Sequence, residues 1–334
     1  MTSDQYNDAK RSAATSLRTL IEGVVLGALY GLFLRGSIFL EKFVHIGNLP
    51  GVMSIGFLFF GPFALGFIVV RRANSGGFVP VWYWIFAPWL ATVLMLAGTA
   101  LLLWEGAICI VMAAPIALVS ASIGGLAAGL LGRHEKPSPR ITACVALLPL
   151  LISGAESGIA APNQTRTVAS EIRIHATPGT VWTNIERVPA IAPSELRENW
   201  VQRIGFPRPI EATLSHEGVG GIRHATFERG VLFIETINAW EPAHLLAFSI
   251  HADTAHIPST TLDEHVTIGG RYFDVLDGEY QIAPVGNGDV VLHLTSHERL
   301  TTDFNGYAGL WTDAVMRSIQ TNILQVIKKR CERA

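Results

Sequence analysis

Charged residues are scarce in this chain of 334 residues, and they are unevenly spread. Asp, Glu, Lys and Arg together make up 16% of the sequence, against roughly 25% in an average soluble protein. Long apolar stretches fill residues 17–161, whereas the sequence from Pro162 onward mixes polar and apolar residues in the ordinary way. The shortage of charge therefore belongs to the first half and indicates two parts with different surroundings.

Positive charge and cysteine are also in short supply. The formal net charge is −2, and nothing indicates the clustered Lys and Arg on which nucleic-acid binding depends, so no nucleic-acid partner is expected. The three cysteines, Cys109, Cys144 and Cys331, form no C-x-x-C pair, which argues against a zinc or thioredoxin-like site. Only Cys331 lies in the second half, which therefore cannot hold an internal disulfide.

Several catalytic motifs are missing. The sequence contains no G-x-S-x-G elbow, no P-loop and no G-x-G-x-x-G run after a strand, so we expect no cofactor. A loop with His251, Asp253, His256, Asp263 and His265 has the residue types of a cation site. Such loops are more often simply solvated, and we expect no metal.

Five apolar segments are candidates for crossing a bilayer, which takes ~20 apolar residues in a helix. They cover residues 17–39, 52–70, 81–104, 107–131 and 141–161. The fifth is the weakest, because it contains Pro149 and Glu156. The sequence therefore predicts an all-α transmembrane bundle of about five helices, with the lipid bilayer as its partner.

The flanking charges predict an orientation. Lys and Arg gather before the first segment, after the second and between the fourth and fifth, at residues 10, 11, 18, 71, 72, 133, 136 and 140. Because these residues favour the cytoplasmic side, we predict a multi-pass protein of the inner (cell) membrane with a cytoplasmic N-terminus. Five crossings place the C-terminal part outside the cytoplasm; if the fifth segment does not cross, that part is cytoplasmic.

The bundle is predicted to anchor rather than to transport. Gly124, Gly125 and Gly129 in the fourth segment permit close helix packing. Arg35 and Glu156 lie near predicted helix ends, where a long side chain reaches water easily, and Glu105 is expected in a surface turn. No chain of carboxylates or histidines indicates a proton pathway.

A short linker separates the two parts. Residues 157–167 read SGIAAPNQTRT, a small and polar stretch with one proline. We place the domains at 1–162 and 163–334. At ~3.3 Å per extended residue, this linker keeps the second domain close to the bilayer.

The second domain is predicted to be α+β. Thr177 and Pro178 form a helix start after a first strand at 168–175, and a second short helix is expected at 193–204. Strands are predicted at 210–215, 222–228, 231–240, 245–251, 270–275, 279–284 and 290–299, with short Gly- or Pro-containing turns between most of them. An amphipathic helix follows at about 307–330. A curved antiparallel sheet wrapped around such a helix leaves room for an apolar ligand.

This order resembles the helix-grip fold of the START and birch-pollen-allergen superfamily, also called SRPBCC, over residues 166–330. The resemblance is carried by IRIHATPGTVWTNIERV (172–188), FERGVLFIETINAWEPAHLLAFSI (227–250), GGRYFDVLDGEYQIAP (269–284) and the final helix. The opening strand followed by A-T-P and V-W is similar to the polyketide-cyclase-like branch. The resemblance implies a hydrophobic-ligand cavity without implying one reaction, because members include carriers, cyclases, hydrolases and ligand sensors.

Strand periodicity nominates the cavity and its candidate acids. Alternate residues share one face of a strand, which groups Val290, Leu292, Leu294, Ser296 and Glu298 on one strand and Val231, Phe233, Glu235 and Ile237 on another. We expect Phe233, Ile237, Leu292, Leu294 and, from the final helix, Trp311 and Val315 to line the cavity; for Trp311 this is what the resemblance implies. A carboxylate in an apolar pocket is suited to acid–base catalysis, so Glu298 and Glu235 are the candidate catalytic residues. The alternatives are that either pairs with Arg223, Arg229 or Arg271, or that it lies at an exposed strand end.

The sequence thus predicts a membrane-tethered module that binds a lipid or another apolar small molecule. One alternative is an enzyme acting on an apolar substrate with Glu298 or Glu235 as acid or base. Another is a ligand sensor coupled to the helical bundle. A carboxylate deep in the cavity beside a second polar group favours the enzyme, whereas a dry apolar cavity favours the carrier.

Overall fold

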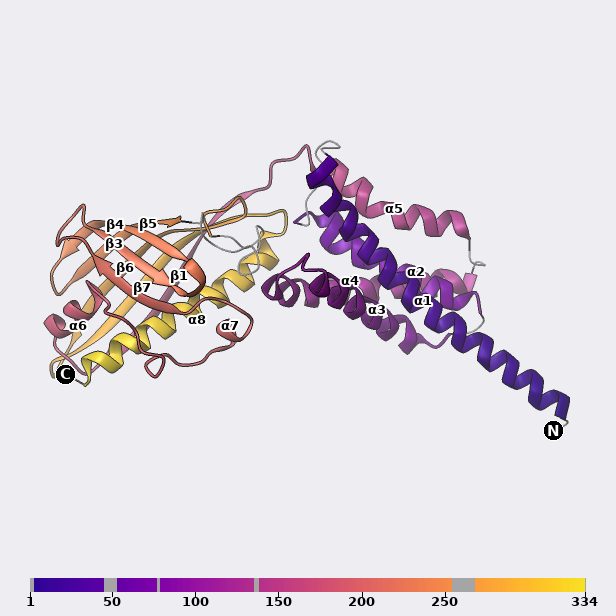
Figure 1. The fold of residues 1–334 in the computed structure, drawn as a ribbon, viewed down its shortest axis with the longest axis horizontal. Helices are drawn as coiled ribbons and strands as arrows, with labels where there is room; N and C mark the ends of the chain where they lie inside the picture. Colours follow the sequence, from indigo (N-terminus) through magenta and orange to yellow (C-terminus); the bar gives the residue numbers. More distant parts are fainter. Residues whose placement is uncertain (1–2, 45–52, 77–78, 135–137, 254–267, 334) are drawn as a thin grey trace. The chain divides into compact units, whose positions relative to one another are not determined.

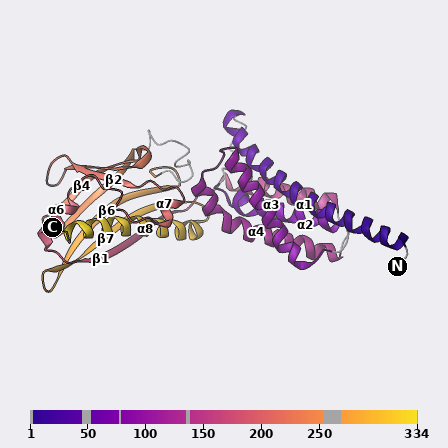
Figure 2. The ribbon, with the colours of Figure 1, turned by 60° about the horizontal axis from the view of Figure 1, so that its bottom comes forward.

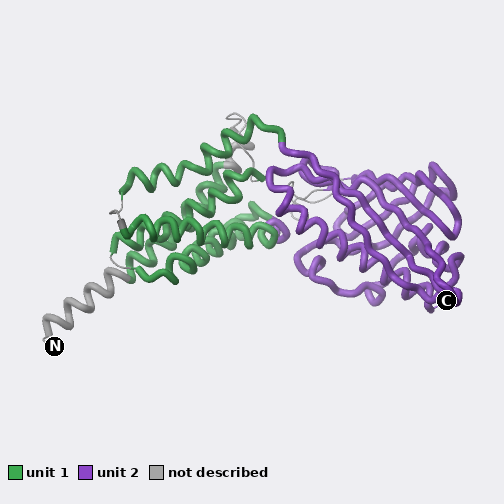
Figure 3. The backbone as a smooth tube through the Cα atoms, turned by 180° about the vertical axis from the view of Figure 1, so that it is seen from behind, with its two compact units in different colours: residues 1–105, 110–160 green, residues 106–109, 161–334 purple. Residues whose placement is uncertain are grey.

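A computed structural model describes residues 3–44, 53–76, 79–134, 138–253 and 268–333, and Figure 1 shows the fold. The chain divides into two compact units, coloured separately in Figure 3. One contains residues 1–105 and 110–160, and the other contains residues 106–109 and 161–334.

The first unit is entirely helical. Its elements are α1 (Ser3–Val44), the π-helical turn η1 (Gly56–Phe60), α2 (Gly61–Asn74), α3 (Val81–Leu101), α4 (Ala107–His134) and α5 (Pro139–Glu156). Within the described residues, five helices are long and apolar enough to cross a membrane, with mean hydropathy from 2.2 for α4 down to 1.3 for α5. The fifth helix begins two residues earlier than predicted and ends at Glu156 rather than residue 161.

Small residues allow the helices to approach closely. A methyl group added to Gly124 of α4 would lie 1.9 Å from the backbone oxygen of Phe63 in α2, so the two helix backbones are nearly in contact there. This confirms the close packing that the glycines predict.

The charged residues of this unit are more tightly paired than predicted. Arg35 donates from Nε to Oε1 of Glu105 at 2.6 Å and from Nη2 to the carbonyl oxygen of Trp104 at 2.7 Å. The side chains of Arg35 and Glu105 are only 6% and 10% exposed. Glu105 does lie in a turn after α3, but the expectation that it is at the surface is wrong, because it pairs with Arg35. The expectation that Arg35 lies near a helix end is also wrong, since α1 continues to Val44.

The second unit is a curved antiparallel sheet with helices against it (Figure 1). Its elements are β1 (Asn163–Ile174), α6 (Pro178–Ile185), α7 (Trp200–Arg203), β2 (Pro209–Leu214), β3 (Ile222–Phe227), the 3-10 turn η2 (Glu228–Gly230), β4 (Leu232–Glu241), β5 (Leu245–Asp253), β6 (Phe273–Val285), β7 (Asp289–Thr301) and α8 (Asn305–Cys331). The seven strands are ordered β1-β7-β6-β5-β4-β3-β2. Every pair of neighbouring strands except β1 and β7 is consecutive in the sequence, so β2 to β7 form a meander and β1 is added beside β7.

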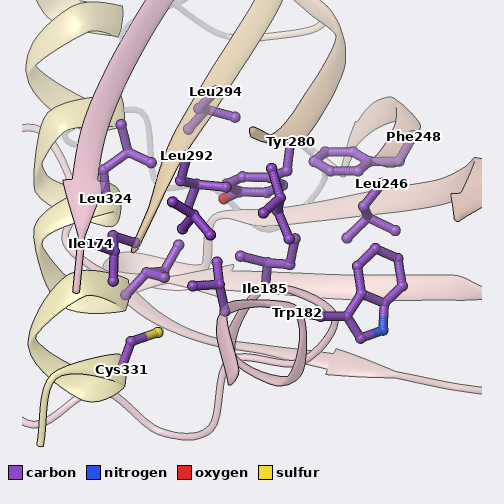
Figure 4. Close-up of a cluster of buried hydrophobic side chains, with 14 of the residues drawn as sticks. Ile174, Trp182, Ile185, Leu246, Phe248, Tyr280, Leu292, Leu294, Leu324 and Cys331 are labelled. Atoms are coloured by element: carbon purple, nitrogen blue, oxygen red, sulfur yellow. The ribbon is translucent and has the colours of Figure 1, made fainter. Parts of the chain in front are cut away.

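The long helix α8 crosses the sheet on one side, as Figure 2 shows, and packs against β1, β7 and α6. The core of this unit lies between them and includes Ile174, Ile185, Leu292 and Leu324, each 1% exposed or less (Figure 4). Thr177 caps α6 by accepting a hydrogen bond from the backbone N–H of Thr180, as predicted. The arrangement is the predicted helix-grip order: strand, short helices, antiparallel strands and a long final helix.

Three elements differ from the prediction. The first strand, β1, begins at Asn163 rather than at residue 168, so residues 163–167 of the predicted linker belong to the sheet. The strands expected at 270–275 and 279–284 are one strand, β6, with a bulge between Val275 and Asp277. The Asp277–Gly278 pair suggested a turn, but Gly278 is needed for space: an added methyl group would lie 2.7 Å from the Phe248 ring. The helix expected at 193–204 is reduced to the four residues of α7, whose start is capped by Asn199.

Candidate ligand cavity

A cavity of about 140 Å³ lies between the sheet and α8 in the second unit. Its sheet side is formed by side chains from β2 to β7, and its helix side by Met316, Ile319, Gln320 and Ile323 of α8. Most of the lining is apolar, with Phe227 and Phe233 packed edge to face at 5.1 Å between ring centroids. Such a space suits an apolar molecule better than a polar one.

A buried ion pair forms one polar part of the wall. Arg223 of β3 and Glu235 of β4 are directly opposite in the strand register, and Nε of Arg223 donates to Oε2 of Glu235 at 2.5 Å. Nη1 of Arg223 donates to the carbonyl oxygen of Ile185 at 2.6 Å. The two side chains are 4% and 7% exposed, so the pair is almost completely removed from water.

Aromatic rings enclose the guanidinium. The Cζ atom of Arg223 lies 4.6 Å from the ring centroid of Phe248 and 5.7 Å from that of Tyr280, an arrangement that favours a cation. Burial raises the pKa of the Tyr280 hydroxyl, against the lowering effect of Arg223, so Tyr280 keeps its proton. Burial also raises the pKa of Glu235, and the charge of Arg223 opposes that rise.

A second polar group lies on the side of β7 and α8. Gln320 donates from Nε2 to the carbonyl oxygen of Val168 at 3.0 Å and to the hydroxyl of Ser296 at 3.1 Å. Its Oε1 accepts from the hydroxyl of Ser170 at 2.8 Å. Gln320 and Ser296 both line the cavity. The hydrogen bonds of Gln320 to β1 and β7 hold α8 against the sheet.

The predicted cavity residues on the strands separate into two groups. Phe233 and Leu294 line the cavity. Ile237 and Leu292 share faces with them, as the periodicity predicts, but they are 1% and 0% exposed within the core cluster around α6. The two groups therefore lie at different heights along the same strands, β4 and β7.

The predicted residues on α8 lie beside the cavity rather than in its lining. Val315 is buried. Trp311 packs against Trp200 of α7, with 6.3 Å between ring centroids. The helix positions that do line the cavity begin one residue after Val315, at Met316.

The two candidate acids have different environments. Glu235 lies in the cavity lining and is held by Arg223. Glu298 is completely buried, lies outside the lining, and its two carboxylate oxygens make no hydrogen bond with described residues. Burial raises the pKa of Glu298 to about 7; the charge of Asp313 adds to the rise, and Thr312 and Arg166 oppose it.

Arg166 and Asp313 form an ion pair next to Glu298. Arg166 is opposite Glu298 in the register of β1 and β7, and it donates to both carboxylate oxygens of Asp313 at 2.8 and 2.6 Å. Arg166 is therefore already neutralised by Asp313, which leaves Glu298 without a strong counter-charge.

The histidines do not form a metal site among the residues that the structure describes, where no group of three or more metal-ligating side chains is found. His293 pairs with Glu171 at 3.1 Å and His297 with Asp277 at 2.7 Å, on the side of β7 away from the core. His256, Asp263 and His265 of the candidate cation loop lie outside the described residues.

Sequence reasoning named Arg223 only as a possible partner of Glu235 and did not single out Tyr280. The available signal for Arg223 was its position within the predicted strand at 222–228, on the same face as Ala225. Tyr280 was not singled out, because a turn was predicted at Asp277–Gly278. That prediction placed Tyr280 near the start of a short strand rather than within one continuous strand.

Comparison with known proteins gives matches among solved structures alone. No protein-family model and no curated protein matches the chain. Norcoclaurine synthase from Thalictrum flavum is 15% identical over 50% of this chain and 86% of its own, with a TM-score of 0.32. A START superfamily protein from Mycobacterium smegmatis is 10% identical over 50% of this chain and 97% of its own, with a TM-score of 0.33.

An aromatase/cyclase from Streptomyces sp. R1128 is also similar. It is 16% identical over 51% of this chain and 95% of its own, with a TM-score of 0.33. The C-terminal half of the chain is similar to START-like proteins. Its fold is assigned from its own strand order and long final helix.

Proposed function

We propose that the C-terminal half binds a compact apolar molecule in the cavity between its sheet and α8, while the N-terminal helices anchor it in a membrane. The observation that carries the proposal is an apolar cavity with a single buried ion pair in its wall. An apolar space of this kind favours apolar ligands and orients them by a few polar contacts.

The size of the cavity limits the ligand. At about 140 Å³ it is comparable to a cavity of about 150 Å³ that takes up benzene. Ordinary ligand pockets measure roughly 300–1,000 Å³. The ligand is therefore one ring system or the end of a chain, rather than a complete two-chain lipid.

The membrane anchor holds the binding domain close to the bilayer, where apolar ligands concentrate. In the part of the chain that the structure describes, five helices suited to crossing a bilayer precede the domain. Only a short connection separates α5, ending at Glu156, from β1, beginning at Asn163. Apolar molecules concentrate in the bilayer, so a tether that holds the binder there raises its effective concentration at the source.

Filling the cavity tests the binding. Ala225 lines the cavity, and Ala225→Phe is expected to lower ligand occupancy at least about tenfold, because the new ring takes the ligand's volume. Full-length protein would be purified in detergent, and bound molecules would be extracted and quantified by mass spectrometry. Thr236→Phe adds the same ring at an exposed position of β4 and serves as the control. Equal ligand content in the two variants, or none in the wild type, would contradict the proposal.

The side of the membrane is a second prediction. With five crossings and a cytoplasmic N-terminus, alkaline phosphatase fused after Arg333 is expected to be active outside the cytoplasm. Deleting residues 139–156, which form α5, is expected to abolish that activity, because four crossings return the C-terminus to the cytoplasm. An inactive fusion in the full-length protein would show that the domain is cytoplasmic.

A catalytic role for Glu235 is the second proposal. It is favoured by one observation, the position of this carboxyl in the lining beside Tyr280. Because Glu235 is paired with Arg223, proton transfer by this carboxyl is less favourable than proton transfer by an unpaired one. Burial raises the pKa of Glu298 to about 7, but this carboxyl lies outside the lining.

A further inference from the structure

We propose that the cavity selects neutral ligands with one hydrogen-bonding group and rejects carboxylates such as fatty acids. The inference rests on the proposed binding function and names the class of ligand within it. It is carried by the way the charges of the lining compensate each other.

The charges of the lining leave no cation for an anionic ligand. Among the described lining residues the charged ones are Arg223, Glu211 and Glu235, so one positive charge is set against two negative ones. The positive charge is already engaged, since Arg223 donates to Glu235 at 2.5 Å and to the Ile185 carbonyl at 2.6 Å. A ligand carboxylate would be buried next to Glu235 without a counter-ion of its own, which is strongly unfavourable.

The ion pair is fixed in place and cannot easily be released. The cross-strand register of β3 and β4 sets Arg223 opposite Glu235, and the rings of Phe248 and Tyr280 enclose the guanidinium (Figure 4 shows these two rings). Both charged side chains are less than a tenth exposed. To bind an anion, Arg223 would have to leave Glu235 buried and unpaired.

The same cluster offers a place for a neutral polar group. Tyr280 lines the cavity, and its ring centroid lies 5.7 Å from Cζ of Arg223. Its protonated hydroxyl can donate a hydrogen bond to a ligand. A ligand hydroxyl or carbonyl oxygen next to Tyr280 would accept that hydrogen bond without adding charge. The chemical class is therefore a compact apolar alcohol, phenol or ketone.

A matched pair of probes tests this inference. 4-Ethylphenol is neutral at pH 7.5 and 4-ethylbenzoate is anionic, while the two have nearly the same size and shape. Binding to the full-length protein in nanodiscs would be titrated by saturation-transfer NMR, with empty nanodiscs as the blank. The wild type is expected to bind the phenol at least about tenfold more tightly, because the negative charge of the benzoate would be buried without a counter-ion.

A variant then reduces or removes the preference for the phenol. Glu235→Gln keeps the side-chain shape and leaves the charge of Arg223 uncompensated, so the ratio of benzoate to phenol affinity is expected to rise at least about tenfold. Glu279→Gln removes the same charge from an exposed position next to Tyr280 in sequence but outside the lining. This control is expected to keep the wild-type ratio.

The outcomes separate the two proposals. Binding of the phenol alone to the wild type supports both the cavity and its charge selection. Equal binding of both probes to the wild type overturns the selection and leaves the cavity standing, and so does an unchanged ratio in a Glu235→Gln protein that still binds the phenol. Failure of both probes to bind the wild type overturns the proposed function, and the inference falls with it.

Discussion

Replacing Arg223 with methionine is expected to destabilise the C-terminal unit by about 3–5 kcal/mol, because it leaves the carboxyl of Glu235 buried without its partner. Glu235 is 5% exposed and lies opposite Arg223 in the strand register. The guanidinium also satisfies the carbonyl oxygen of Ile185, so one substitution leaves two buried acceptors unpaired. Hydrogen-exchange mass spectrometry of the full-length protein would follow the loss in peptides from β3 and β4.

A double variant separates the ion pair from the packing. Arg223→Met combined with Glu235→Leu removes both charges and is expected to recover most of the loss, since an apolar pair of similar volume replaces a buried ion pair at little cost. Arg187→Met breaks an ion pair whose side chains are 49% and 63% exposed and is expected to cost no more than about 1 kcal/mol. An equal effect of Arg187→Met and Arg223→Met would contradict the assigned role of burial.

The second large effect is a pH dependence at Glu298. Burial raises the pKa of this carboxyl to about 7 from an ordinary value of 4.5, so the folded state holds the proton more tightly than the unfolded state. The stabilisation from this group is therefore complete below pH 4.5 and is lost as the pH rises to 7. The difference between the two pKa values corresponds to about 3 kcal/mol.

Glu298→Gln removes this titration. The free energy of opening of the variant, relative to that of the wild type, is expected to increase by about 3 kcal/mol between pH 4.5 and pH 8. Hydrogen exchange in β7 and α8 peptides, corrected for the intrinsic effect of pH, measures it. Glu279→Gln changes an exposed carboxyl on the neighbouring strand and is expected to leave the pH profile unchanged. A constant difference between Glu298→Gln and wild type across this range would show that Glu298 is not perturbed.

Periodicity predicted which residues are buried more reliably than which ones line the cavity. Alternate residues of β7 are buried from Val290 to Leu300, including Glu298, as the period-two pattern predicts. The same pattern does not distinguish Leu292 from Leu294, because both point to the same side. Leu294 lines the cavity, whereas Leu292 contacts the core around α6.

The physical reason lies in how α6 and α8 fill the space under the sheet. Val181, Trp182 and Ile185 of α6 join Leu324 and Ile327 of α8 in the core cluster, and together they leave no space at that end. Where α6 does not reach, α8 passes over the strands at Met316 to Ile323 and the cavity remains. The height of a residue along its strand therefore decides its role, and height depends on which other elements pack there.

By itself the sequence determined the two-part organisation, the apolar helices, the buried faces of the strands and the capped start of α6. These features depend on local composition and on the periods of the helix and strand, which can be read from neighbouring residues. The tertiary structure alone decided the continuity of β6, the pairing of Arg35 with Glu105 and of Arg223 with Glu235, and the position of the cavity. Each depends on contacts between segments distant in sequence, and the free energy of burying a charge or leaving a space is set only when those segments meet.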